Sequence, residues 1–107
     1  MFTIDGKKSR ALDDAISFNK VEDGVYRVGI HISDVASLIQ SKTALDAEAL
    51  KRAESTYVLN SFHLPMLPRE LNSGVCSLNE DQARLAVTLW INLDDRGIAD
   101  FSSASYE

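Results

Sequence analysis

The segment "AISFNKVEDGVYRVGIHIS", residues 15–33, decides the fold because two runs typical of β-strands flank a Glu-Asp-Gly turn. In the second run apolar and polar residues alternate, as in a strand whose two faces differ. One face carries Tyr26, Val28, Ile30 and Ile32, and the other carries Arg27, Gly29 and His31. The segment therefore predicts an antiparallel β-hairpin.

The rest of the chain adds helices and then more strands. Asp34 is placed to cap a short helix over residues 35–40, and Thr43 with Asp46 forms a capping box for a surface helix over residues 44–55. Two prolines in "LPMLP", residues 64–68, predict an extended loop. The alternation in "RLAVTLWINLDDRGIADF", residues 84–101, predicts a strand, a turn at residues 94–97 and another strand from Ile98. This order predicts an α+β fold, a mostly antiparallel sheet with covering helices.

Composition limits the classes of function. The 107 residues, 45% hydrophobic and 25% charged, are typical of one soluble globular domain. The sequence lacks an apolar run of about 20 residues and a signal-peptide pattern, so a cytoplasmic location is the default expectation. The single Cys76 and two histidines argue against a disulfide or a zinc site. A net charge of -5 indicates that basic groups for binding a nucleic-acid backbone would come mostly from elsewhere.

An acidic cluster lies at the start of the chain. In "TIDGKKSRALDDAISF", residues 3–18, Asp5 precedes a basic loop and Asp13 and Asp14 close it. A loop that returns on itself would gather the three carboxylates around one point, provided that the strand begins after Asp13. Such oxygen ligands suit Mg²⁺ or Mn²⁺ and imply phosphoryl transfer or phosphodiester hydrolysis. The alternative is a solvated surface loop whose lysines and arginine neutralise the aspartates.

Four segments in this order and spacing resemble the ribonuclease II/ribonuclease R family, whose catalytic domain is the RNB domain. They are "TIDGKKSRALDDAISF", "VGIHISDVASLI", "LDAEALKRAESTY" and "LPMLPRELNSGVCSLNEDQARLAV". The resemblance covers nearly the whole chain and corresponds to the N-terminal third of the family's catalytic domain, so residues 1–107 are expected to be part of a larger domain.

The resemblance implies a 3'→5' hydrolytic exoribonuclease that degrades single-stranded RNA to nucleoside 5'-monophosphates with Mg²⁺. Asp5, Asp13 and Asp14 match family aspartates that bind metal or position the water and the terminal ribose. A fourth family aspartate is replaced here by Ala11. Tyr57 matches an aromatic residue that stacks on the 3'-terminal base. The other catalytic groups would follow Glu107, so this chain alone is expected to be inactive or nearly so.

The resemblance also implies partners: single-stranded RNA, the rest of the catalytic domain and flanking OB-type RNA-binding domains. Because Ala11 replaces an aspartate, an RNA-binding or regulatory relative with weak or no hydrolysis is the alternative. A third possibility is a non-nuclease domain with surface aspartates.

Other residues with reactive or charged side chains have structural interpretations. His31 is not expected to act as a general base, because it lies on a strand face. Arg52, Arg69 and Arg84 have local partners or positions that favour structural roles, and Trp90 is expected to pack under the helices.

Overall fold

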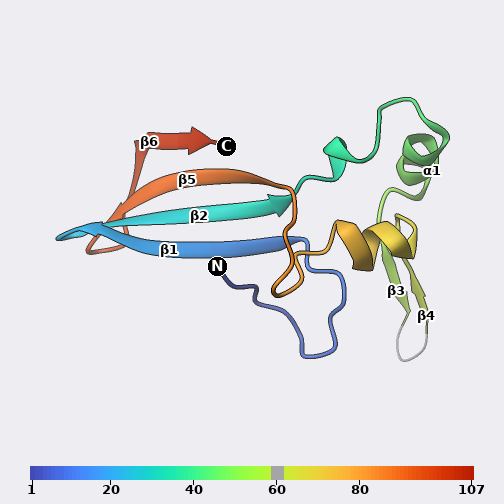
Figure 1. The fold of residues 1–107 in the computed structure, drawn as a ribbon, viewed down its shortest axis with the longest axis horizontal. Helices are drawn as coiled ribbons and strands as arrows, with labels where there is room; N and C mark the ends of the chain where they lie inside the picture. The colour runs from blue at the N-terminus through green and yellow to red at the C-terminus, as the bar shows by residue number, and fades with distance from the viewer. Residues whose placement is uncertain (59–61) are drawn as a thin grey trace.

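The predicted hairpin forms the first half of a four-stranded antiparallel sheet. In the computed structural model, which describes residues 1–58 and 62–107, β1 (Asp14–Glu22) pairs with β2 (Val25–Ser33). β2 pairs with β5 (Ala86–Asp94), and β5 pairs with β6 (Ala99–Tyr106), giving the order β1-β2-β5-β6 (Figure 1). Gly24 and Gly97 have φ angles of 78° and 80° in the two turns, which only glycine adopts without strain. The fold class is confirmed.

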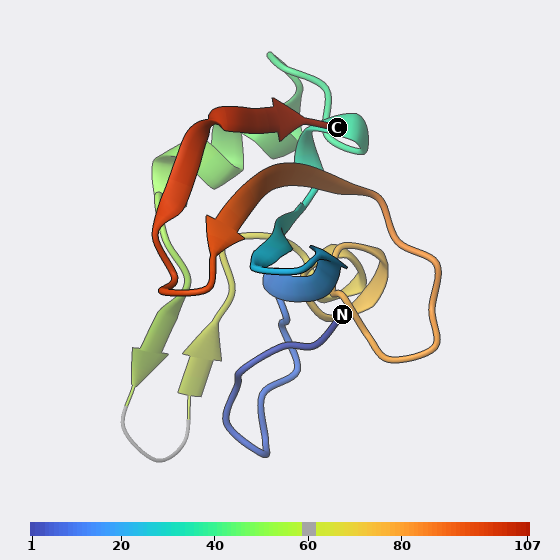
Figure 2. The same ribbon diagram turned by 90° about the vertical axis from the view of Figure 1, so that its left-hand side faces the viewer.

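The strand register confirms the alternation and shows which face is packed. Gly29 lies between Ser17 and Trp90, so a Cβ at position 29 would be 2.6 Å from Ser17 Oγ and 2.7 Å from Trp90 Cζ3. This face is also where His31 and Thr88 are buried. The opposite face carries the apolar stripe, of which Phe18, Ile30, Ile32 and Val87 are exposed. Seen along the strands, the sheet curls from β1 to β6 (Figure 2).

The helices lie beyond the ends of the strands rather than over a face of the sheet (Figure 1). The expected cover of one face by helices is therefore not found among the described residues. Trp90 does not pack under them either: its ring lies edge-on to His31, with centroids 5.6 Å apart, and 5.0 Å from the Arg27 guanidinium. Its indole Nε1 donates to a Glu107 carboxylate oxygen at 2.9 Å.

Both predicted helix caps are confirmed, although the helices are shorter than expected. Asp34 accepts from the Ser37 amide at the 3₁₀ helix η1 (Val35–Ser37). Thr43 accepts from the Asp46 amide at α1 (Ala44–Arg52), which ends where Ala53 adopts a φ of 65°. No helix in the described ranges is long and apolar enough to cross a membrane.

Two elements that the sequence pattern did not predict complete the chain. A small hairpin, β3 (Thr56–Val58) and β4 (Phe62–Leu64), precedes the predicted proline loop. The π-helical turn η2 (Glu70–Val75) follows that loop, and its regular geometry breaks at Gly74. Both elements lie near the residue 5–14 loop in Figure 1, so they belong to the neighbourhood of the candidate site.

Candidate functional site

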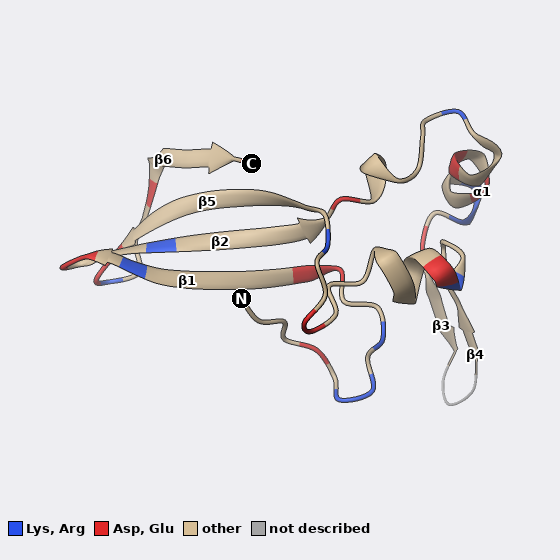
Figure 3. Cartoon of the chain, viewed as in Figure 1, with Lys and Arg blue, Asp and Glu red and all other residues tan. Residues whose placement is uncertain are grey.

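The acidic loop, residues 5–14, enters the sheet at β1. Because β1 begins at Asp14, Asp13 lies outside the strand, and the two adjacent carboxylates are not forced onto opposite faces. The loop turns where the Ser9 amide donates to the Gly6 carbonyl at 2.8 Å. Its lysines and arginine lie along the bend and its aspartates at the two ends (Figure 3). The three aspartates are exposed, so their carboxylates remain accessible to a ligand.

The described residues do not by themselves form the geometry of a metal site. Within residues 1–58 and 62–107 the structure groups no three His, Cys, Asp or Glu side chains that could hold one metal ion. The expectation that Asp5, Asp13 and Asp14 surround one point is therefore not met by this chain. Their donor chemistry still fits magnesium, which prefers oxygen ligands and usually takes one or two carboxylates, with water and phosphate completing its shell. Their roles as ligands stay a prediction.

Tyr57 projects from the β3–β4 hairpin. Its ring stacks on the His63 imidazole across the hairpin, with centroids 4.4 Å apart and planes inclined by 12°. Tyr57 is nevertheless 70% exposed. A tyrosine supported on one side and open on the other has the form of a stacking platform for a nucleic-acid base.

A cavity of about 450 Å³ connects the acidic loop to this hairpin. Lys8, Arg10 and Ala11 line it from the loop, and Tyr57 and His63 line it from the hairpin. The cavity therefore joins the middle of the acidic loop to Tyr57, whereas Asp5, Asp13 and Asp14 are not among its lining residues. The cavity is large enough for part of a nucleotide.

Arg69 also lines this cavity, together with Ser73 from η2. Sequence reasoning assigned Arg69 a structural role because Glu70 is its neighbour, and missed this position. With Lys8 and Arg10, Arg69 gives the cavity three cationic side chains despite the negative net charge of the chain. The sequence carried no signal for this convergence, because the loop and Arg69 are distant along the chain.

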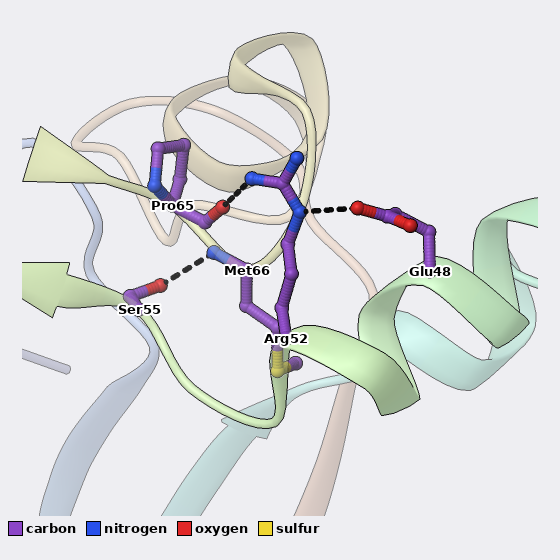
Figure 4. Close-up of polar contacts among 5 residues, drawn as sticks. All are labelled: Glu48, Arg52, Ser55, Pro65 and Met66. Carbon is purple, nitrogen blue, oxygen red and sulfur yellow. Dashed lines mark hydrogen bonds and ion pairs between the residues drawn. The ribbon is translucent and has the colours of Figure 1, made fainter.

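One hydrogen bond closes the base of the β3–β4 hairpin, and another ties it to the last residue of α1 (Figure 4). The Met66 amide donates to Ser55 Oγ at 2.9 Å, and Arg52 Nη1 donates to the Pro65 carbonyl at 3.2 Å. Arg52 Nε also donates to Glu48 at 2.9 Å, which agrees with the local partner expected for Arg52 and lowers the pKa of the Glu48 carboxyl. Arg52 therefore fixes the hairpin that carries Tyr57.

The segment Cys76–Ser77–Leu78 lies buried beneath the acidic loop. The Leu78 amide donates to the Leu12 carbonyl at 2.9 Å. Burial, and secondarily the negative charge of Asp13, raises the pKa of the Cys76 thiol. Arg84 Nε donates to the Ser77 carbonyl at 3.0 Å, so its predicted structural role is confirmed. Cys76 is a packed, protonated thiol next to the site.

Both ring nitrogens of His31 lie within hydrogen-bond distance of side chains on neighbouring strands. Its Nε2 is 2.8 Å from Ser17 Oγ and its Nδ1 is 2.9 Å from Thr88 Oγ1, and the residue is 8% exposed. Burial, and secondarily the positive charge of the amino terminus, lowers its pKa. With both ring nitrogens bonded inside the sheet, His31 is a structural residue.

The comparisons with known proteins agree on one family. The model of the RNB domain matches residues 1–104. Ribonuclease R 2 of Lactococcus lactis is 43% identical over 96 residues, and ribonuclease R of Thermotoga maritima is 42% identical over 95 residues. These alignments cover 90% and 89% of this chain but 14% and 13% of the relatives' lengths.

A solved structure, Mycoplasma genitalium RNase R in complex with ribose methylated single-stranded RNA, superposes with a TM-score of 0.90 at 30% identity. The match covers 98% of this chain and 16% of that one. The chain thus spans about one seventh of the length of these relatives.

Proposed function

We propose, because the chain belongs to the RNB domain family, that the full-length protein is a 3'→5' exoribonuclease that hydrolyses single-stranded RNA to nucleoside 5'-monophosphates with Mg²⁺. The observation that carries the proposal is the cavity in which Ala11 of the acidic loop meets Tyr57 and Arg69. A cytoplasmic location and flanking OB-type domains belong to the same proposal.

The candidate site residues of this chain have three different roles in the proposed reaction. Tyr57 stacks on the 3'-terminal base without reading its identity, a contact worth roughly 1–3 kcal/mol per base. Lys8, Arg10 and Arg69 attract the phosphate groups near that nucleotide. The carboxylates of Asp5, Asp13 and Asp14 would hold magnesium, which, when bound, supplies positive charge to the phosphodiester under attack.

The isolated chain is proposed to be inactive or nearly so, because it supplies one wall of the site. The further catalytic groups would come from the rest of the RNB domain. Magnesium-dependent release of monophosphates by the isolated 107-residue chain would contradict this part of the proposal.

A second candidate function is RNA binding with weak or no hydrolysis. Two observations favour it: Ala11 lines the cavity where the resemblance places an aspartate, and the described residues contain no three-carboxylate metal group. In this case Tyr57 and the basic side chains of the cavity hold RNA, while the acidic loop lacks the carboxylate at position 11 that hydrolysis would require.

One experiment separates the two candidates. The full-length protein is incubated with 5'-labelled single-stranded RNA in magnesium, in manganese and in chelator. Progressive shortening from the 3' end in the presence of metal supports the exoribonuclease. Stable retention without shortening in any condition supports the RNA-binding protein, and absence of both binding and shortening rejects the two proposals together.

A further inference from the structure

Ser77 joins the two peptide groups that flank residue 11. Its hydroxyl oxygen accepts from the Leu12 amide at 3.1 Å and lies 3.2 Å from the Arg10 carbonyl, which accepts from it. Asn79 Oδ1 lies 3.0 Å from the same oxygen. A hydroxyl has one proton, so Ser77 donates either to Arg10 or to Asn79, while the bond from Leu12 persists in both arrangements.

Ser77 is fully buried, with an exposed fraction of 0%. It lies 65 residues from Leu12 in sequence, so the contact brings together distant segments. The bond from Leu78 to Leu12 continues the contact, and the Ser33 amide holds the Asp13 carbonyl at 2.9 Å. The backbone of residues 10–13 is therefore fixed while the Asp13 and Asp14 side chains remain exposed.

We propose that Ser77 is a positioning residue for the acidic loop: its hydroxyl sets the backbone path through residues 10–12 and thereby the placement of the Asp13 and Asp14 carboxylates. The proposal rests on the proposed function. Ser77 is not a catalytic residue, because it is fully buried and does not reach substrate. Without its hydroxyl the Leu12 amide loses its partner, and a buried unpaired amide drives the loop toward another path.

The consequence for catalysis follows from geometry. A misplacement of about 1 Å in a catalytic group costs up to about a hundredfold in rate. Ser77→Ala should therefore reduce kcat by roughly tenfold to a hundredfold and raise the magnesium concentration needed for half-maximal rate. RNA affinity measured in chelator should fall by a smaller factor than kcat, because Arg10 moves with the loop whereas Tyr57 lies on the β3–β4 hairpin, stacked on His63.

The test uses the full-length protein and a matched control. Ser17→Ala removes a buried hydroxyl of the same size, but that hydroxyl bonds His31 within the sheet. Amide hydrogen exchange over residues 9–14 is measured without metal or RNA, so one readout is independent of activity. Ser77→Ala should speed exchange at Leu12 and lower kcat, whereas Ser17→Ala should lower thermal stability and leave both unchanged.

Each outcome has a defined meaning. Slower turnover and faster Leu12 exchange in Ser77→Ala alone support the proposal. Unchanged kcat in Ser77→Ala, or equal losses in both variants, overturn it. If Ser77→Ala does not fold, Ser77→Cys is measured instead, since a thiol donates and accepts hydrogen bonds only weakly. A folded Ser77→Cys protein with the kcat of the parent overturns the proposal, whereas a reduced kcat supports it. Absence of hydrolysis by the parent protein rejects the proposed function instead, and Leu12 exchange then decides the positioning role.

Discussion

The Tyr57 ring lies on the His63 imidazole of the neighbouring strand, with centroids 4.4 Å apart. The contact supports one face of the ring, whereas the residue as a whole stays 70% exposed. Tyr57 is therefore supported on one face by His63 and is not part of a core.

Tyr57→Ala in the full-length protein should weaken binding of the RNA 3' end by about 1–3 kcal/mol, because one base loses its stacking partner. The final product should also change in length. Fluorescence anisotropy and gel analysis of end products measure the two effects. Tyr57→Phe keeps the ring and should behave like the parent. A loss of cooperative thermal unfolding in Tyr57→Ala would instead identify Tyr57 as a core residue.

Arg52→Gln should make the β3–β4 hairpin more mobile, because the hydrogen bonds of Arg52 to Pro65 and Glu48 are lost together. The cost in stability should be small, below about 1 kcal/mol, since exposed ion pairs contribute little. Amide exchange in β3 and β4 should nevertheless rise, and binding of the RNA 3' end should weaken. Lys20→Gln breaks another exposed ion pair, with Asp23, far from the hairpin, and is the control. Equal exchange in both variants would contradict the prediction.

Ala11→Asp should raise the maximal rate of hydrolysis and lower the magnesium concentration for half-maximal rate, because it restores a carboxylate where the resemblance places one. RNA affinity in chelator should hardly change. Ala11→Asn, which adds similar volume without the charge, is the matched control. If the rest of the domain already supplies a compensating carboxylate, Ala11→Asp should lower both rate and stability. A rate that does not rise over a wide magnesium range would reject the idea of a weakened metal site.

His31 should make the stability of the 107-residue chain depend on pH. Burial lowers its pKa below the ordinary value of 6.5, so the unfolded state binds a proton more readily than the folded state. The contribution of His31 to the free energy of unfolding is therefore fully present above pH 6.5. It decreases as the pH falls from there toward the pKa of His31 in the folded state. Thermal unfolding between about pH 5 and 8 measures this slope. His31→Gln should remove part of the slope, and an unchanged slope in this variant would contradict the prediction.

Gly29→Ala should destabilise the sheet by roughly 1–3 kcal/mol, because overpacking forces neighbours to move. The added Cβ would lie within 3 Å of Ser17, Trp90 and His31. Denaturant unfolding measures the loss. Gly6→Ala is the control, since nothing lies within 4 Å of its Cβ position. Equal stability of the two variants would show that the sheet adjusts freely at position 29.

The features predicted correctly from sequence depend on neighbours in the chain. The hairpin of residues 15–33 follows from alternation and one turn, and the caps at Asp34 and Thr43 act within three residues. Such bonds form wherever the local residues are placed suitably.

The features that were missed depend on contacts between distant segments. Arg69 shares a cavity with Lys8, and Ser77 bonds Leu12 across 65 residues. The side chain of a serine in the middle of "VCSLN" gives no local sign of its partner. The position of the helices was also mispredicted, because their apolar residues do not specify which surface they approach.

The contact between Ser77 and the acidic loop has a consequence for substitutions at position 11. Ser77 holds the peptide groups beside residue 11 and makes no use of the side chain there. The loop can therefore carry either alanine or aspartate at position 11 while its backbone keeps the same hydrogen bonds to Ser77. Under the proposed function, a change at position 11 would alter turnover while the cavity wall formed by Tyr57, His63 and Arg69 stays in place.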